Sequence, residues 1–246
     1  MKILAGARLF IVSVSIGLFL LPGPAAAQQT FKLPTVPFPT GMTFDGTSLY
    51  LSNDSGPREV FQVDPHTGTV LSSIPFGGNP TGLVFESGHL FASDIGSFVS
   101  ENGTSEEFND SFGLPFRGGS IAFDGTSLFI GDADSGQILV TDLLGKTIVA
   151  FDSGSRPTGL VFDPVSGDLW DIDHFDNKIR EITTNGILVR SCASPFHPGA
   201  FGIGGIALAE DTFYVAEPLN GDPTTGTEIL VLPMDTLACE PPLSGR

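Results

Sequence analysis

Short apolar runs recur along this chain, and residues that favour turns (glycine, proline, aspartate or asparagine) separate them. Runs of this length between turn residues predict β-strands rather than helices. Within residues 41–74 the pattern predicts four strands, at 42–44, 49–52, 59–64 and 69–74. The first two are joined at Asp45-Gly46, where glycine supplies a positive φ without steric conflict.

The same pattern returns four more times. The segment 41–52 (GMTFDGTSLYLS) reappears at 82–93 (GLVFESGHLFAS), 120–131 (SIAFDGTSLFIG), 159–170 (GLVFDPVSGDLW) and 205–216 (GIALAEDTFYVA). A period near ~40 residues with several short strands per unit is typical of a β-propeller. We therefore predict an all-β fold, a β-propeller of about five four-stranded blades. The weakest strand predictions fall in the polar second unit, at 97–112.

The two ends of the chain are complementary. Residues 31–40 resemble the fourth strand and exit loop of the other units, and the fifth unit has only residues 237–246 after its third strand. We expect the N-terminal strand to pair into the last blade and close the ring, which removes an exposed sheet edge. Cys192 and Cys239 fall in neighbouring blades, so a disulfide is expected in an oxidising compartment, with two free thiols as the alternative.

The first 27 residues differ from the rest. Lys2 and Arg8 precede the apolar run 9–21, and Ala25-Ala26-Ala27 supplies small residues before Gln28. This predicts a signal peptide at 1–27 and a single propeller domain at 28–246, secreted or periplasmic. An uncleaved anchor is the alternative, but the apolar run is shorter than the roughly 20 residues a spanning helix needs.

Charge narrows the classes of partner. The chain has 28 Asp+Glu against 11 Lys+Arg, a formal net charge of −17. Such a surface does not suit nucleic acid or anionic membranes, which attract cationic proteins. We expect a soluble monomer, not bound to a membrane in its mature form, whose partner is an unidentified ligand or protein.

One polar position recurs at the end of the second strand of each unit. It is occupied by Asn53, Asp94, Asp132, Asp173 and Glu217. In a closed ring these side chains lie at equivalent depth, and converging oxygen ligands suit Ca²⁺ or another divalent cation. The alternative is that each one accepts backbone N–H bonds within its own loop, as in Asx-turns.

Asp171 departs from the repeat. The aligned positions are apolar, so unit four has a carboxylate where the other units have Leu51, Ala92, Ile130 and Val215. Such a carboxylate requires a partner or a purpose. It opens the polar stretch 171–177 (DIDHFDN), which makes Asp171 and His174 candidate catalytic residues, with His174 as acid/base. The alternative is a solvated loop with Asp171 hydrogen-bonded to a neighbouring blade. His197, Arg117 and Arg156 are weaker candidates in the loops between units.

The run 157–182 (PTGLVFDPVSGDLWDIDHFDNKIREI) resembles a repeat of the NHL-type propeller superfamily. That superfamily is similar to the gluconolactonase/regucalcin and virginiamycin B lyase-like families. The resemblance implies a propeller, and in gluconolactonase-like enzymes a divalent metal at the central channel. Asn53, Asp132 and Asp173 are positional analogues of its later ligands, whereas the early Glu-Gly-Pro-x-Trp motif is absent from this chain.

Two functions follow from these patterns. The first is a binding module for a protein, glycan or small ligand on the face formed by two sets of loops. These are the B–C loops, between the second and third strands of a blade, and the D–A loops, between successive blades. The second is a divalent-metal-dependent hydrolase or lyase, lactonase-like, with its site at the channel mouth.

Overall fold

The computed structural model describes residues 29–33, 35–53, 58–76, 78–94, 98–102, 110–113, 119–173, 176–195, 204–222 and 224–241. The strands within these ranges are joined by turns and by two short 3₁₀ helices, η1 (Leu219–Gly221) and η2 (Met234–Thr236). The predicted all-β class is confirmed. The predicted signal peptide at 1–27 lies outside the described residues and stays a prediction.

The strands form five antiparallel sheets, numbered here in chain order. Sheet one contains β2 (Pro39–Phe44), β3 (Leu49–Asn53), β4 (Glu59–Val63) and β5 (Val70–Pro75). Sheet two contains β6 (Pro80–Glu86), β7 (His89–Asp94), β8 (Phe98–Asn102) and β9 (Asp110–Gly113). Sheet three contains β10 (Ile121–Phe123), β11 (Leu128–Asp132), β12 (Gln137–Thr141) and β13 (Thr147–Asp152).

The last two sheets also take strands from the ends of the described chain. Sheet four contains β14 (Pro157–Asp163), β15 (Asp168–Asp173), β16 (Lys178–Ile182), β17 (Leu188–Ala193) and β21 (Cys239–Glu240). Sheet five contains β18 (Ile206–Ala209), β19 (Thr212–Pro218), β20 (Thr227–Pro233) and β1 (Gln29–Leu33). The strand β1 pairs with β20 in antiparallel register.

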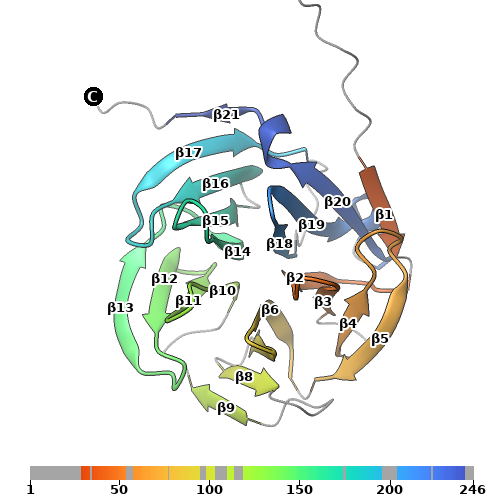
Figure 1. The fold of residues 1–246 in the computed structure, drawn as a ribbon, viewed down its shortest axis with the longest axis horizontal. Helices are drawn as coiled ribbons and strands as arrows, with labels where there is room; N and C mark the ends of the chain where they lie inside the picture. Colours follow the sequence, from red (N-terminus) through yellow and green to blue (C-terminus); the bar gives the residue numbers. More distant parts are fainter. Residues whose placement is uncertain are drawn as a thin grey trace, which may run out of the picture.

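The sheets are arranged around a common axis like the blades of a propeller (Figure 1). The strands β2, β6, β10, β14 and β18 lie innermost, and β5, β9, β13 and β17 lie on the outside. The hairpin turn between the two innermost strands, which we call the A–B turn, follows from the DGTS sequence in sheets one and three. In sheet one Asp45 Oδ1 accepts the N–H groups of Thr47 and Ser48, at 2.7 and 2.6 Å, and Gly46 has a φ of 93°.

Apolar side chains fill the spaces between neighbouring sheets. Each of five buried clusters contains residues of two adjacent sheets, and one of them joins sheet five to sheet one. Trp170 of sheet four packs edge-on against Phe213 of sheet five, with ring centroids 5.0 Å apart. This contact joins sheets four and five.

Glycine at the first position of the repeat lets the inner strands approach at backbone distance. A Cβ atom at Gly205 would lie 2.1 Å from the Met42 nitrogen, and one at Gly82 would lie 2.4 Å from the Gly119 oxygen. Real Cβ atoms do not approach so closely, so these positions exclude every larger residue while the sheets stay in place. We call this narrow part of the axis, formed by Gly41, Gly82, Ser120, Gly159 and Gly205, the glycine collar.

Hydroxyl groups beside the collar connect successive sheets. Thr40 Oγ1 donates to the Pro80 carbonyl at 2.5 Å, Thr81 Oγ1 to the Gly119 carbonyl at 3.3 Å, and Ser120 Oγ to the Pro157 carbonyl at 3.0 Å. In sheets one and two the sequence Pro-Thr-Gly at the start of the inner strand therefore combines a close approach with a hydrogen bond to the next sheet.

The predicted disulfide is confirmed. Cys192 in β17 is bonded to Cys239 in β21, and the two residues face one another across the β17–β21 pairing. The bond fixes the segment that follows sheet five to the outer strand of sheet four.

Candidate functional site

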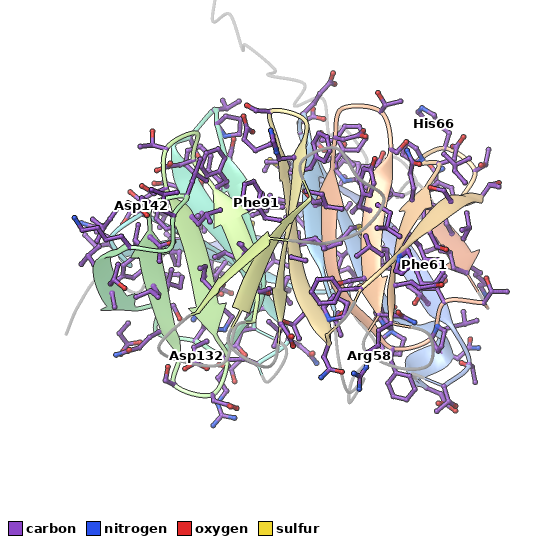
Figure 2. The ribbon with its side chains drawn as sticks, turned by 90° about the horizontal axis from the view of Figure 1, so that it is seen from below. Arg58, Phe61, His66, Phe91, Asp132 and Asp142 are labelled. Atoms are coloured by element: carbon purple, nitrogen blue, oxygen red, sulfur yellow. A yellow bond between two sulfur atoms is a disulfide. The ribbon has the colours of Figure 1, made fainter. Side chains whose placement is uncertain are left out.

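The polar position that recurs in each unit lies at one end of the propeller. Asn53, Asp94, Asp132 and Asp173 end the second strands β3, β7, β11 and β15, and Glu217 lies near the end of β19. Figure 2 shows Asp132 at the same end of the molecule as Arg58, and His66 and Asp142 toward the opposite end. The four residues Asn53, Asp94, Asp132 and Asp173 thus occupy corresponding positions in their strands.

Two of these side chains hold their own B–C loops. Asn53 Oδ1 accepts the Glu59 N–H at 3.0 Å. Asp132 Oδ1 accepts the Asp134 N–H at 3.0 Å, and its Oδ2 accepts the Ser135 hydroxyl at 2.6 Å. These are the Asx-type contacts that were the alternative to metal ligation.

The other two aspartates reach the neighbouring D–A loop. Asp94 Oδ1 accepts the Asn79 N–H at 3.1 Å. Asp173 Oδ1 accepts the Asp176 N–H at 3.2 Å. Asp173 Oδ2 accepts the backbone N–H of Arg156 at 3.5 Å. Their carboxylates therefore contribute to the conformation of loops on this face.

Glu217 differs from the other members because it lies within a strand. It is fully buried and faces Glu228 across the β19–β20 pairing. Among the described residues no group of three or more His, Cys, Asp or Glu side chains comes together in a way that could hold a metal ion. The predicted Ca²⁺ or other divalent cation stays a prediction.

Asp171 is fully buried and makes a bidentate ion pair. The Arg180 guanidinium donates from Nε to Oδ1 at 3.0 Å and from Nη2 to Oδ2 at 2.8 Å, and the Ser155 hydroxyl donates to Oδ2 at 2.6 Å. Arg180 also donates from Nη1 to the Gly154 carbonyl at 2.8 Å. The network connects β15 and β16 to the loop between sheets three and four.

Burial raises the pKa of the Asp171 carboxyl group, and hydrogen bonding and charge from Arg180, together with the Ser155 hydrogen bond, lower it in part. A buried carboxylate needs such compensation, because an unpaired charge in this position is strongly unfavourable. The arrangement can hold the loop before β14 against the second and third strands of sheet four.

The other candidates are only partly within the described structure. His174, the proposed acid/base partner of Asp171, lies outside the described residues, as do His197 and Arg117. Arg156 is exposed in the D–A loop before β14. The catalytic prediction for Asp171 and His174 therefore stays a prediction.

The sequence analysis missed Arg180, although a signal for it was present. The cross-strand partner at this level is apolar in sheets one, three and five, where Leu51 faces Phe61, Ile130 faces Leu139 and Val215 faces Leu230. In sheet four both members change together, to Asp171 facing Arg180. A double departure from the repeat at facing positions indicates an ion pair.

Neither a protein-family model nor a curated protein matches this sequence. Among solved structures, the chain is similar to glutaminyl cyclase from Myxococcus xanthus, with a TM-score of 0.67 and 12% identity over 82% of this chain and 93% of that one. It is also similar to hydrazine synthase from Kuenenia stuttgartiensis, with a TM-score of 0.50 and 16% identity over 74% of this chain and 56% of that one.

The fold is a β-propeller. At these identities the likeness shows the fold alone, and the NHL-type resemblance of 157–182 stays a prediction. A fold of this kind supports many unrelated functions, so function must be argued from sites. No helix within the described ranges is both long and apolar enough to cross a membrane.

Proposed function

We propose that this protein is an exported β-propeller that binds a protein, glycan or small ligand on the face formed by its B–C and D–A loops, without catalysing a reaction. Export is inferred from the predicted signal peptide at 1–27 and is compatible with the Cys192–Cys239 disulfide, since such bonds persist in oxidising compartments.

The observation that carries the non-catalytic proposal is the network around Asp171. The carboxylate most unlike the rest of the repeat is paired with Arg180 through both oxygens and also accepts the Ser155 hydroxyl. A carboxylate held in this way supports loop structure. A general base needs a lone pair within reach of a substrate proton.

The lengths of the connections support a ligand site on this face. The connection between β17 and β18 spans 194–205, and that between β19 and β20 spans 219–226. The A–B turns at the other end are short, as at 45–48 and 87–88. Binding residues are concentrated on loops that a rigid scaffold positions, and the backbone contacts of Asn53, Asp94, Asp132 and Asp173 supply such positioning.

We further propose that the five sheets are the five blades of a closed ring, with β1 as the outer strand of the last blade. The β1–β20 pairing and the buried cluster between sheets five and one support this proposal. Deleting residues 28–33 should then lower the melting temperature of the mature chain substantially, because the outer strand of sheet five and buried Leu33 are lost together.

The test uses the mature chain, residues 28–246, on a glycan array and with a random-peptide display library. Any ligand obtained is mapped by hydrogen–deuterium exchange. We expect protection of the D–A and B–C connections 194–205 and 219–226, with no protection of the A–B turns. Protection confined to the A–B turns would contradict the assignment of the face.

The enzymatic alternatives are tested on the same preparation. Hydrolysis of a lactone and of an aryl ester is measured with Ca²⁺, Mg²⁺, Mn²⁺ or Zn²⁺, and cyclisation of a peptide with N-terminal glutamine is measured because of the glutaminyl cyclase neighbour. We expect no turnover in any assay. Turnover that disappears in a folded Asp171→Asn variant would overturn the binding proposal in favour of an enzyme.

A further inference from the structure

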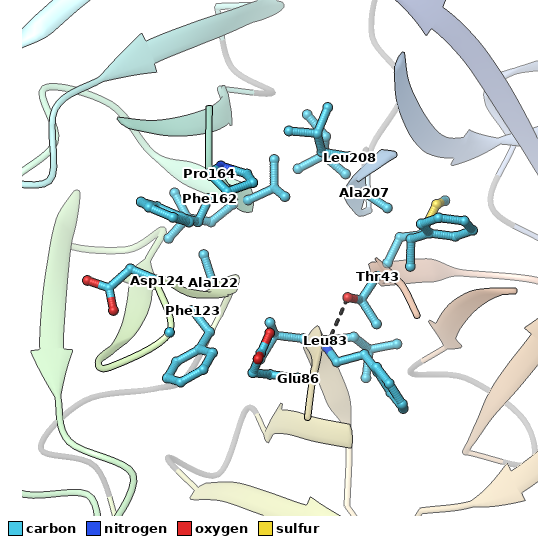
Figure 3. A pocket seen from close by; sticks show the side chains of 18 residues that line it. Thr43, Leu83, Glu86, Ala122, Phe123, Asp124, Phe162, Pro164, Ala207 and Leu208 are labelled. Carbon is cyan, nitrogen blue, oxygen red and sulfur yellow. Dashed lines mark hydrogen bonds between the residues drawn. The ribbon is translucent and has the colours of Figure 1, made fainter. Parts of the chain in front are cut away.

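A cavity opens on the axis at the end of the inner strands that carries the A–B turns (Figure 3). Its volume is ≈ 390 Å³, and it is lined by residues of β2, β6, β10, β14 and β18 and of the turns that follow them. We call it the mouth cavity. Its volume falls within the range of about 300–1,000 Å³ that is usual for sites of small molecules.

The mouth cavity is closed at its inner end. At the level of the glycine collar the free space on the axis is only ≈ 10 Å³, about the volume needed to hold one water molecule. A ligand larger than water can therefore enter only from the A–B side. The cavity is thus separate from the loop face of the proposed function, and the two ligand sites do not depend on each other.

Most of the residues that line the mouth cavity are apolar, and neighbouring sheets hold them in place. The fourth position of the repeat supplies half-buried phenylalanines in the first four sheets, Phe44, Phe85, Phe123 and Phe162. Phe44 stacks on Tyr214 with ring centroids 6.5 Å apart, and Phe85 stacks on Tyr50 at 5.7 Å. The walls are therefore formed before any ligand arrives, which reduces the entropy cost of binding.

The entrance of the mouth cavity is acidic. An acidic residue lies at the end of the inner strand or in the A–B turn of every sheet, and no A–B turn contains lysine or arginine. These acidic residues are Asp45, Glu86, Asp124, Asp163 and Glu210. Of these, Glu86 and Asp124 line the cavity. In Figure 3 Glu86 lies beside the open centre and Asp124 points outward at the rim.

The two lining carboxylates keep capacity to accept further hydrogen bonds. Glu86 Oε1 accepts the Ser87 hydroxyl at 3.0 Å, and Asp124 Oδ1 accepts the N–H groups of Thr126 and Ser127. Within the described ranges these contacts leave Glu86 Oε2 and Asp124 Oδ2 available. A concave, low-dielectric site with one sign of charge focuses the field and concentrates ions of the opposite sign.

We propose that the mouth cavity binds a small organic cation with an apolar body, such as a quaternary or primary ammonium compound. The hydrocarbon part of such a ligand contacts the apolar wall, while its positive charge is attracted by Glu86, by the acidic turns and by aromatic rings. Anions are repelled by the same turns. A bare divalent metal ion is a less suitable ligand, because Ca²⁺ takes six to eight oxygen ligands and the carboxylates that line the cavity are those of Glu86 and Asp124.

The experiment is a calorimetric titration of the mature chain with benzyltrimethylammonium at low ionic strength. Uncharged benzyl alcohol and anionic benzoate are the comparison ligands. We expect binding of the ammonium compound at least tenfold tighter than that of benzyl alcohol, and no binding of benzoate. The affinity should fall as salt is raised, because exposed charges are screened.

Variants assign the binding to this cavity. Glu86→Gln combined with Asp124→Asn should weaken binding of benzyltrimethylammonium at least tenfold, and the amide oxygen that replaces the Asp124 carboxylate can still accept the turn hydrogen bonds. The matched control is Asp142→Asn. It removes one of the two negative charges that the double variant removes, at a carboxylate that caps another turn through the N–H groups of Leu144 and Lys146 but does not line the cavity.

A second variant keeps the proposal falsifiable if the charge changes disturb folding. Val161→Phe fills the cavity from a half-buried wall position and should abolish binding while the melting curve stays cooperative. Three results would each overturn the proposal: absence of binding by the wild-type chain, equal binding of benzyl alcohol, or equal losses in the double variant and in Asp142→Asn.

Discussion

The two ends of the five inner strands behave differently although they belong to the same strands. At the glycine collar the backbones touch and the axis admits no more than about one water molecule. A few residues further along, the same strands border the mouth cavity of ≈ 390 Å³. The difference arises from side chains, because the repeat changes from glycine or serine at its first position to phenylalanine or leucine at its fourth.

The collar positions and the mouth positions of the repeat are under different structural constraints. The collar residues are restricted by contact between neighbouring backbones, so nearly every blade must satisfy the same steric limit. The mouth residues are restricted by packing against the next sheet, so size and polarity vary, with Thr43, Val84 and Ala122 at one position. Changes at the collar should therefore affect stability, and changes at the mouth should mainly affect what can bind.

The largest effect is expected from Gly205→Val at the collar. A Cβ atom there would meet backbone atoms of Gly41 and Met42, which cannot move without separating sheets five and one. The loss should exceed about 4 kcal/mol, and the chain should fail to give a cooperative melting transition by circular dichroism. The control is Ser120→Ala, at the one collar position that already carries a side chain. This variant loses the hydrogen bond to the Pro157 carbonyl, and its free energy of unfolding should fall by only about 1 kcal/mol. A Gly205→Val variant that melts like the wild type would contradict close contact at the collar.

The next largest effect concerns the ion pair at the level of the collar in sheet four. Asp171→Ala leaves the largely buried Arg180 without its partner and should lower the free energy of unfolding by about 3–5 kcal/mol in urea. Asp171→Ile combined with Arg180→Leu restores the apolar pair of Ile130 and Leu139 in sheet three, and should recover most of that loss. A double variant as unstable as Asp171→Ala would show that an apolar pair cannot replace the ion pair at this position.

A smaller effect is expected at the hydroxyl contacts of the collar. Thr81 Oγ1 lies within hydrogen-bonding distance of the Gly119 carbonyl and of Ser93 Oγ, so Thr81→Val should lower the free energy of unfolding by about 1 kcal/mol. The measurement is the midpoint of urea unfolding at constant slope. Thr67→Val, in an exposed turn, is the control and should change stability by less than about 0.5 kcal/mol. Equal losses of stability in Thr81→Val and Thr67→Val would contradict a special contribution of the hydroxyl contacts at the collar.

The smallest effect on stability is expected at the mouth end and appears at high pH. Burial, the Asp45 charge and a hydrogen bond to Asp45 raise the pKa of Tyr50 to about 12, and burial raises the pKa of Tyr214. These are the two tyrosines of the chain. The folded protein should therefore show little tyrosinate absorbance at pH 10, whereas the chain unfolded in urea should titrate near its ordinary value of about 10.

The sign of the stability change follows from these pKa values. Because the folded state holds the phenol protons more tightly than the unfolded state, stability should fall as pH rises from about 10 towards 12. Asp45→Asn removes the charge beside Tyr50 and should lower its pKa, leaving Tyr214 as the internal control. A folded chain whose tyrosines both titrate at about 10 would contradict the stacking at the mouth.

Much of the fold could be predicted from the sequence, because the same pattern of strands and turns occurs five times along the chain. The predicted strands 49–52 and 59–64 correspond to β3 (Leu49–Asn53) and β4 (Glu59–Val63). The predicted inner strand 42–44 was too short, since β2 begins at Pro39. Proline has no backbone N–H to donate, but it is tolerated as the first residue of a strand. The weak region 97–112 contains β8 and the beginning of β9, whose polar composition concealed them.

The sites were less predictable because they depend on contacts between units. The loop contacts of Asn53 and Asp132 could be anticipated from the chemistry of asparagine and aspartate in turns. The pairing of Asp171 with Arg180 required the register of β15 against β16, which a comparison of facing positions could have supplied. The mouth cavity depends on how closely five sheets approach at the collar, and no single unit contains that information.

The pairing of β1 with β20 has a consequence for how the chain reaches its folded state. Phe31 lies opposite Ile229, so the first described strand finds its partner only after nearly the whole chain is present. Closing so long a loop is slow compared with forming local hairpins. Sheet five therefore stays incomplete until β20 is present, so we expect its completion to be a late step in folding.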